Sequence, residues 1–331
     1  MKTYDCIILG GGPAGLSVAA TLKEEGFDVA VVERKHTGYN VSRFPICMRF
    51  FSSRDLVELN NFSLTIPDDK PTREQYMTYL YHFVQRKEIT VIDYTNIEKV
   101  EKIKEAFHLS GKDARGNSVQ FLSKAVVVAV GALDHPQMLN VEGEDLPHVT
   151  HYFNEIYPYI GHRVLVVGSG NGAVETALLL YRGGATVSLS HRSSQLNGKK
   201  IKYWMYPDIL KRLEKGEIEN LSQTEIEKID QQKVLFSKTS ENPKTEKFEK
   251  EFDFVVLQTG YEPPVGFLSQ MGIDIDPESK IPKHDEQNLE TNISGLFVAG
   301  AIVGGNVSGK VFIENSRFHG GQILPRLKEI I

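Results

Sequence analysis

The sequence predicts an α/β protein that contains two copies of one strand–turn–helix–strand unit. Residues 4–33, YDCIILGGGPAGLSVAATLKEEGFDVAVVE, align without a gap with residues 162–191, HRVLVVGSGNGAVETALLLYRGGATVSLSH. In both copies an apolar run leads into glycines with the Gly-x-Gly-x-x-Gly/Ala spacing and then into a helical pattern. Two copies in one register are more specific than a single motif, and they predict two Rossmann-like dinucleotide-binding domains.

Each copy is completed by an apolar strand that ends in small residues, AVVVAVGA at 125–132 and FVVLQTGY at 254–261. The first unit is the longer one, because an insertion lies mainly between Glu33 and Thr95. A larger ligand needs more walls around its site, and the insertion lies where such walls would stand. We therefore expect the first unit to bind the larger ligand.

The domain boundaries follow from two proline-containing segments, residues 133–148 and 262–266, which we interpret as crossings between domains. The chain after the second crossing has no counterpart in the second unit, so we expect it to return to the first. The predicted first domain therefore comprises residues 1–135 and 262–331. The predicted second domain, residues 136–261, is inserted in it.

Composition limits the classes of partner. The chain has 331 residues, 40% of them hydrophobic and 24% charged, with a net charge of −5 and no basic stripe. These values argue against nucleic acid as a partner. The first residues lack a secretory signal and no apolar run reaches membrane-spanning length, so we expect a cytoplasmic protein without a membrane partner. We expect no metal site.

The glycines of the first turn each have a distinct expected role. Gly10 permits the tight bend, Gly12 lets the backbone approach a pyrophosphate, and Gly15 allows close packing of the helix on the strand. The start of the helix supplies amide donors to the phosphates. The second copy repeats the arrangement with Gly168, Gly170 and Ala173.

The two copies differ where their second strands end. Glu33 ends the first one, and a carboxylate there accepts both hydroxyls of an adenosine ribose but repels a 2′-phosphate. His191 holds the same register in the second copy, followed by Arg192, and both favour a 2′-phosphate. Arg34 occupies the same register as Arg192, so the arginine does not distinguish the two copies. The exchange of Glu33 for His191 does distinguish which ribose each copy accepts. We expect FAD in the first unit and NADPH in the second; the alternative is a pair of glycine turns without ligands.

The whole chain resembles flavoproteins of the low-molecular-weight thioredoxin reductase type, and more closely the YpdA-type bacillithiol disulfide (bacilliredoxin) reductases. The motifs that carry the resemblance are GGGPAGLS, FPICMRFFSS, HYFNEIYPYIG, GSGNGA, IKYWMYP, TGYEPP and VFIENSRFHGG. The resemblance implies an FAD-dependent NADPH oxidoreductase that acts on the disulfide of a low-molecular-weight thiol or of a bacilliredoxin. It also implies a homo-oligomer, a dimer or tetramer.

The resemblance also implies two sets of cofactor-binding residues. The residues expected to hold FAD are Gly10, Gly12, Pro13, Ala14, Gly15, Glu33, Arg34, Ile97, Gly131, Gly300, Ala301, Val311 and Phe312, the last two at the start of the final helix. The residues expected to hold NADPH are Gly168, Gly170, Asn171, Gly172, Ala173, His191, Arg192 and Lys202.

Three departures from the related families bear on the chemistry. Thioredoxin reductases carry a CxxC before the second glycine turn, where this chain reads THYFNEIYPY, so we expect no direct reduction of thioredoxin. Ala301 stands where an aspartate would contact the flavin ribitol. Ala14 stands where the YpdA-type enzymes have the cysteine credited with their redox chemistry.

The chain has two cysteines, Cys6 and Cys47. Cys6 lies in the first apolar strand, and we expect it to be a core residue. Cys47 lies in the segment expected to pass the flavin, and neighbouring Arg43 and Arg49 would favour its thiolate, so it is the candidate catalytic residue. The alternative is that Cys47 is part of the apolar wall of the flavin pocket.

His319 and the beginning of the last helix near Lys310 are further candidates. The histidine would either donate a proton at the flavin or have a structural role. The helix dipole would stabilise negative charge on a reduced flavin.

The electron acceptor stays open between a disulfide and a thiol-independent acceptor such as ferredoxin or a quinone. A flavin monooxygenase is disfavoured, because Asp145, Pro147 and Glu155 occupy three positions of its signature around His151. A sensor of NADPH is disfavoured by the two complete nucleotide motifs.

Overall fold

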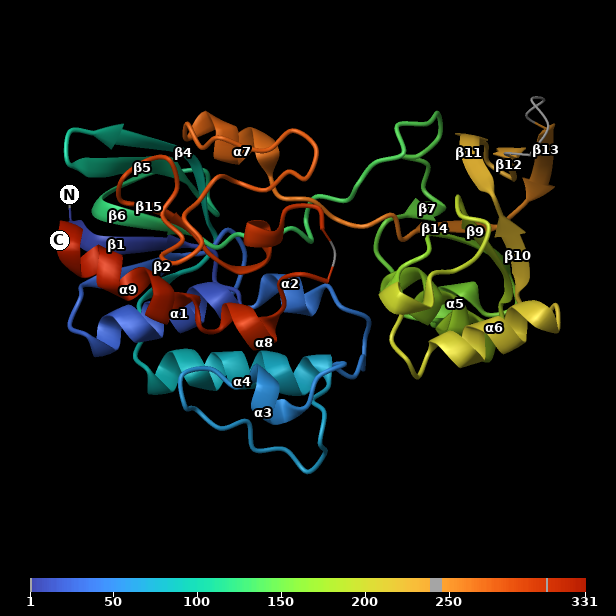
Figure 1. The fold of residues 1–331 in the computed structure, drawn as a ribbon, viewed down its shortest axis with the longest axis horizontal. Coiled ribbons are helices and arrows are strands. Elements are labelled where there is room, and N and C mark those ends of the chain that lie inside the picture. Colours follow the sequence, from blue (N-terminus) through green and yellow to red (C-terminus); the bar gives the residue numbers. More distant parts are fainter. Residues whose placement is uncertain (1, 239–245, 308) are drawn as a thin grey trace. The chain divides into compact units, whose positions relative to one another are not determined.

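A computed structural model of the chain describes residues 2–238, 246–307 and 309–331. The chain divides into two units, and the second is inserted in the first (Figure 1). The first unit comprises Met1–His135 and Tyr261–Ile331, and the second comprises Pro136–Gly260. Both units are α/β, so the predicted fold class is confirmed.

The first unit is built on a seven-stranded sheet of order β3-β2-β1-β6-β5-β4, with β15 also paired to β6. β1, β2, β3 and β15 join parallel ladders, whereas β4 and β5 are antiparallel additions. The long β6 changes partner along its length, from β5 at residues 118–123 to β15 at residues 126–128. The strands are β1 (Thr3–Leu9), β2 (Val29–Val32), β3 (Val91–Ile92), β4 (Thr95–Ile103), β5 (Ala106–Asp113), β6 (Ser118–Val128) and β15 (Leu296–Val298).

The sheet is covered on both faces, which explains the continuous apolar runs in its central strands. Cys6 and Ile8 of β1 belong to the core that contains residues of α1, α4 and α9. The alternate residues Ile7 and Leu9 belong to the opposite core, with residues of β4, β5 and α7. Cys6 is fully buried, as predicted, and burial raises the pKa of its thiol.

The insertion after Glu33 forms three helices, of which α4 is the longest. The start of α4 is fixed by a capping box, in which Thr72 and Gln75 exchange hydrogen bonds between side chain and backbone. No helix in the described residues has the length and apolar composition to cross a membrane. The helices of this unit are α1 (Pro13–Glu24), α2 (Tyr39–Ser42), α3 (Arg54–Val57), α4 (Arg73–Arg86), α7 (Val265–Gln270), the 3₁₀ helix η3 (Gly300–Gly304), α8 (Ile313–Ser316) and α9 (His319–Ile330).

The single C-terminal helix expected from residue 311 was a wrong prediction, because the chain forms α8 and α9 with a break at Arg317 and Phe318. The carbonyl of Arg317 accepts the hydroxyl of Ser17 (2.6 Å). Gly321 N–H, which would donate to that carbonyl in a continuous helix, donates to Phe318 O instead. Ser17 is a fully buried residue of α1, so packing against α1 interrupts the helix.

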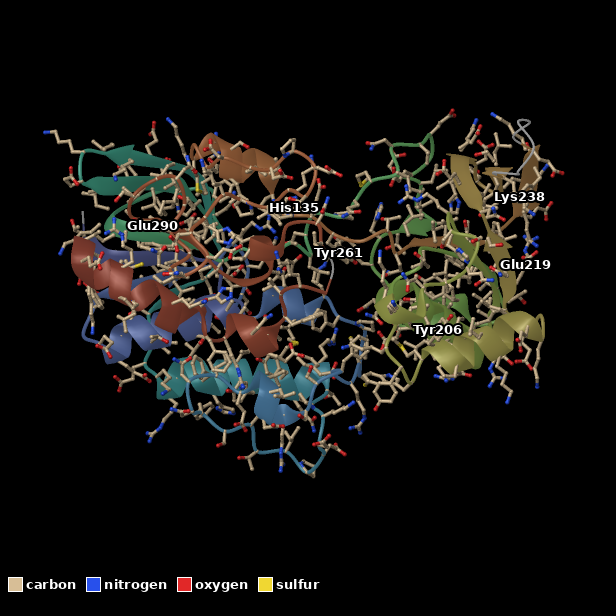
Figure 2. The ribbon with its side chains drawn as sticks, viewed as in Figure 1. His135, Tyr206, Glu219, Lys238, Tyr261 and Glu290 are labelled. Carbon is tan, nitrogen blue, oxygen red and sulfur yellow. The ribbon has the colours of Figure 1, made fainter. Side chains whose placement is uncertain are left out.

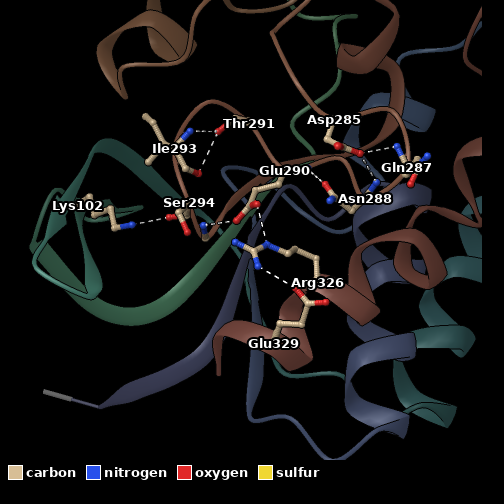
Figure 3. A network of polar contacts seen from close by, with 11 residues as sticks. Lys102, Asp285, Gln287, Asn288, Glu290, Thr291, Ile293, Ser294, Arg326 and Glu329 are labelled. Carbon is tan, nitrogen blue, oxygen red and sulfur yellow. Dashed lines mark hydrogen bonds and ion pairs between the residues drawn. The ribbon is translucent and has the colours of Figure 1, made fainter.

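The returning C-terminal segment is fixed by a polar network around Glu290 (Figure 3). One carboxylate oxygen of Glu290 accepts Gly295 N–H and the other accepts Arg326 Nε, both at 2.8 Å. Lys102 of β4 donates to Ser294 O (2.7 Å). The loop before β15 is thereby joined to α9 and to β4.

The second unit contains a five-stranded parallel sheet of order β10-β9-β8-β14-β7 and a three-stranded antiparallel sheet, β11-β12-β13. Its strands are β7 (Val149–Thr150), β8 (Arg163–Val167), β9 (Thr186–His191), β10 (Glu219–Ser222), β11 (Thr224–Ile229), β12 (Lys233–Lys238), β13 (Glu246–Glu251) and β14 (Phe254–Leu257). Its helices are α5 (Asn171–Arg182), α6 (Tyr206–Glu214) and the 3₁₀ helices η1 (Tyr157–Tyr159) and η2 (Gly198–Lys200).

The two crossings are bonded to each other by their backbones. Glu262 N–H donates to His135 O, and Gln137 N–H donates to Gly260 O, both at 2.9 Å. Figure 2 labels His135, the last residue of the first unit's N-terminal part, and Tyr261, the first residue of its C-terminal part.

Candidate functional site

The first glycine turn joins β1 to α1 and leaves open space at the start of the helix. Gly10 has φ +109°, and a Cβ there would lie 2.5 Å from Ala129 O. A Cβ on Gly15 would lie 2.1 Å from Gly10 O. Gly12, the N-cap of α1, has no atom within 4 Å of the corresponding position. The turn therefore requires Gly10 and Gly15 for its own packing, whereas the bare backbone at Gly12 suits an anion at the helix N-terminus.

Glu33 is held rigidly at the end of β2. Its side chain is buried, and its carboxylate accepts Gly11 N–H (2.7 Å) and Lys35 N–H (2.8 Å). These bonds orient the carboxylate without using all of its lone pairs. Glu33 can therefore accept the hydroxyls of a ribose placed beside the turn.

A cavity of about 370 Å³ adjoins this turn in the first unit. Of the residues predicted to hold FAD, the ones that line it are Gly10, Gly12, Glu33, Arg34 and Ile97. The lining residues that sequence reasoning missed include Tyr39 and Asn40 of α2, three residues of the crossings, Asp134, His135 and Pro264, and Phe267 of α7. The signal for Asp134, His135 and Pro264 was the proline-containing crossings themselves, which we interpreted only as connections between domains.

Gly131 and Gly300 both have positive φ, at +71° and +76°. A Cβ on Gly131 would lie 2.6 Å from Asn40 Nδ2, and one on Gly300 would lie 3.0 Å from the Ala14 methyl. Ala301 is exposed. Val311 and Phe312 precede the one-turn α8 rather than the long final helix.

Ala14 is the second residue of α1, after Pro13, and is 9% exposed. Its methyl group faces Gly300, so the α1 N-terminus and η3 meet at this residue. Position 14, where the resemblance led us to expect a cysteine, therefore carries a methyl group and no thiol.

Cys47 is exposed and has φ +59°. Its N–H donates to the Glu74 carboxylate (3.2 Å), and it is not among the residues that line the cavity. Arg43 donates to the Tyr39 hydroxyl, and Arg49 pairs with Asp68. The redox role of Cys47 stays a prediction, and these contacts give it no support.

His319 is buried and accepts Gly300 N–H at Nδ1 (3.1 Å). Burial, aided by neighbouring His284, lowers the pKa of His319 to about 4. The imidazole is therefore neutral at pH 7 and holds η3 in place. Lys310, the other helix-start candidate, precedes a helix of a single turn.

We predict that His319 makes folding pH-dependent. Between pH 6.5 and 4 the unfolded chain binds a proton more readily than the folded one, so stability falls as the pH falls through this window, by about 3 kcal/mol. Denaturant titrations of wild type and His319→Asn at several pH values measure this effect. The variant should lose less stability across the window, and equal losses would contradict the prediction.

The second glycine turn repeats the geometry of the first between β8 and α5. Gly168 has φ +138°, and a Cβ there would lie 2.3 Å from Gln258 O and 3.0 Å from the Ala173 methyl. Gly170 caps α5 and has no atom within 4 Å of its Cβ position. A Cβ on Gly172 would lie 2.8 Å from Gln258 Oε1. This turn also presents a bare helix N-terminus that fits a pyrophosphate.

The end of β9, which we expected to face a 2′-phosphate, differs from the expectation in one respect. His191 is 3% exposed, and its ring nitrogens contact Asn220 Oδ1 (3.1 Å) and Ser193 Oγ (3.2 Å). Burial lowers the pKa of His191, so the ring supplies no positive charge at pH 7. Arg192 is exposed and has no hydrogen bond or ion pair within the described residues, so its charge is available to an anion.

Asn171 fixes the segment that carries Lys202. Its Oδ1 accepts Lys202 N–H (2.9 Å), so a residue of the turn holds the loop before α6. The Lys202 ammonium lies 5.9 Å from the centre of the Trp204 ring. Asn171 therefore positions a cation-bearing loop beside the second turn.

Glu175 of α5 was not singled out from the sequence. Burial raises the pKa of its carboxyl to about 7, and it makes no hydrogen bond or ion pair with the described residues. A carboxyl group with this pKa is about half protonated at neutral pH. A pKa shifted this far from its ordinary value is typical of functional sites.

Comparison with known proteins decides the family. The model of the pyridine nucleotide-disulphide oxidoreductase family matches residues 7–300. The chain belongs to this family. The Bacillus subtilis (strain 168) protein named bacilliredoxin reductase Bdr is 36% identical over 321 residues, which cover 97% of this chain and 96% of that protein. The expected FAD- and NADPH-dependent oxidoreductase is thereby confirmed at the level of the family.

Solved structures agree with this pyridine nucleotide-disulphide oxidoreductase assignment. The bacillithiol disulfide reductase Bdr (YpdA) from Bacillus cereus superposes with a TM-score of 0.95 at 34% identity, with 99% of each chain covered. That from Staphylococcus aureus has a TM-score of 0.91 at 28% identity, again with 99% of each chain covered. The ferredoxin–NADP reductase of Ignicoccus hospitalis is a more distant relative, 25% identical with 90% of each chain covered.

Proposed function

We propose that this oxidoreductase passes reducing equivalents from NADPH through FAD to the disulfide of a bacillithiol-type thiol or of a bacilliredoxin. The observation that carries the proposal is the end-to-end similarity to proteins named for these substrates, at up to 36% identity and with 97% of this chain covered. When bound, FAD supplies the chemistry that accepts a hydride and delivers two electrons.

FAD is proposed to lie in the domain formed by residues 1–135 and 262–331. The α1 N-terminus at Gly12 would receive the pyrophosphate, and Glu33, oriented by two backbone amides, would accept the adenosine ribose hydroxyls. Ala14, Gly131, Gly300 and the segment at Ala301 would adjoin the ribityl chain and the flavin. The open space at Gly12 and the adjoining 370 Å³ cavity support this placement.

NADPH is proposed to lie in the domain of residues 136–261. Its pyrophosphate would bind at Gly170, where the helix N-terminus is bare, and its 2′-phosphate would meet Arg192. His191 would contribute to this site by holding Ser193 through a hydrogen bond, and not by a positive charge of its own. Asn171 would keep the loop of Lys202 beside the cofactor.

A second candidate is a thiol-independent reductase that delivers electrons to ferredoxin or another small acceptor. Two observations favour it: position 14, where the resemblance implies a cysteine, is alanine, and Cys47 does not line the cavity. The Ignicoccus hospitalis relative named ferredoxin–NADP reductase, 25% identical with 90% of each chain covered, is consistent with it.

Reoxidation of the reduced protein distinguishes the two candidates. The protein is reduced anaerobically with NADPH and mixed with bacillithiol disulfide, with oxidised bacilliredoxin or with oxidised ferredoxin, and flavin absorbance is followed. Return of the oxidised spectrum with either disulfide supports the first function. Flavin that stays reduced until ferredoxin is added supports the second.

We predict that Cys47→Ala retains at least about half of the wild-type rate of disulfide reduction, because Cys47 lies outside the cavity beside a carboxylate rather than a free cation. Steady-state NADPH oxidation with bacillithiol disulfide measures the effect. A loss of more than about tenfold, with unchanged NADPH-dependent flavin reduction, would assign the redox role to Cys47.

We also propose a cytoplasmic homo-oligomer, a dimer or tetramer, from the family resemblance and the lack of a disulfide framework. Light scattering of the purified protein tests the oligomeric state.

A further inference from the structure

An ion pair joins two walls of the cavity in the first unit. Arg34 Nη2 lies 2.5 Å from Asp134 Oδ2. Arg34 directly follows Glu33 at the end of β2, whereas Asp134 lies after Gly131 in the segment that leads to the first crossing. Both residues line the cavity, and they are 100 positions apart in the chain.

The exposure of the two side chains places the pair at the rim of the cavity. The Arg34 side chain is 46% exposed and the Asp134 side chain 18%, whereas the neighbouring Glu33 is a buried residue. Among the described residues that line the cavity, Arg34 is the only arginine or lysine, and the acidic ones are Glu33, Glu98 and Asp134. The Glu33 carboxylate is already bonded to two backbone amides. The Arg34 guanidinium donates to Asp134 instead.

The segment that carries Asp134 is itself restrained. His135, which also lines the cavity, accepts Glu262 N–H from the second crossing (2.9 Å). The acidic half of the pair is thus attached to the two crossings, and the basic half to the central sheet. Opening this side of the cavity separates the two halves.

From this geometry we propose that the Arg34–Asp134 pair is a latch that retains the dinucleotide of the first unit. The pair keeps the crossing segment against the end of β2, and it must break before the adenosine end of the ligand leaves. The proposal rests on the proposed binding of FAD in this cavity. It assigns Arg34 a role in closing the site rather than in contacting a phosphate.

The rate of FAD release from the holoprotein tests the latch without any assay of turnover. Release is followed from the rise of free-flavin fluorescence after dilution, for wild type, Arg34→Ala, Asp134→Ala and the double variant. We expect each single variant to release FAD about fivefold faster, and the double variant to be no faster than either, since all three lack the same pair. Arg182→Ala, which breaks the similarly exposed Arg182–Asp208 pair of the second unit, is the matched control with an unchanged rate.

A charge-swapped variant separates the latch from direct contact between Arg34 and FAD. Arg34→Asp combined with Asp134→Arg should restore slow release if the pair itself retains the ligand. Faster release from Arg34→Ala alone, with Asp134→Ala at the wild-type rate and no rescue by the swap, would overturn the proposal. So would unchanged release in all variants. A wild-type protein without bound flavin would instead refute the proposed function on which the latch depends.

Discussion

Replacing Ala14 by cysteine is expected to increase the rate of disulfide reduction on the order of tenfold. Residue 14 is the second residue of α1, where the helix N-terminus lowers the pKa of a thiol and favours the reactive thiolate. Its side chain faces Gly300, which has no side chain to obstruct a sulfur atom. NADPH oxidation with bacillithiol disulfide measures the rate, and alkylation as a function of pH measures the thiol.

Ala14→Ser is the matched control for this prediction, because it adds a group of similar size without redox chemistry. The serine variant should keep the wild-type rate. An unchanged rate in Ala14→Cys, together with a correctly folded and flavin-loaded protein, would mean that electrons reach the acceptor without a thiol at this position, as the second candidate function requires.

Gly12→Ala and Gly170→Ala are expected to separate the two cofactors. A Cβ at either position meets no protein atom within 4 Å, and both residues have φ values open to alanine, −80° and −92°. Both variants should therefore fold, and the Tm of the apoprotein should be unchanged; the holoprotein's Tm falls only by the lost ligand binding. The added methyl group occupies the approach of the pyrophosphate, so we expect affinity to fall on the order of tenfold or more, for FAD in Gly12→Ala and for NADPH in Gly170→Ala. Flavin content after purification and the KM for NADPH measure the two effects.

Gly15→Ala provides the contrast, because its Cβ would lie 2.1 Å from Gly10 O. This variant should lose stability rather than cofactor affinity alone, and thermal unfolding of the apoprotein detects the difference. The assignment of the two turns would be contradicted if Gly170→Ala lost flavin and kept its affinity for NADPH.

The sequence was sufficient to predict the features that depend on local spacing. The glycines of both turns have the predicted roles in packing, because a Cβ at Gly10, Gly15 or Gly168 would meet backbone at 2.1–2.5 Å. The alternating burial of Ile7 and Ile8 on opposite faces follows from a continuous apolar run in a parallel strand.

Features that depend on distant partners were not predictable in the same way. His191 matches Glu33 in register, but Asn220 and Ser193 bury and bind its ring, so charge could not be inferred from residue type. The break before α9 results from the Ser17 hydroxyl, some 300 positions away. Asp134 lines the cavity because of the way the crossing folds, and no local sequence motif indicates that fold.

The account depends on FAD and NADPH occupying separate units and exchanging electrons. The most direct test is an anaerobic titration of the purified, flavin-loaded protein with NADPH, followed by flavin absorbance. We predict that stoichiometric NADPH bleaches the flavin in wild type and that Gly170→Ala, with its FAD retained, requires a large excess. Flavin that stays oxidised in the presence of excess NADPH, or a protein that binds no flavin, would contradict the account.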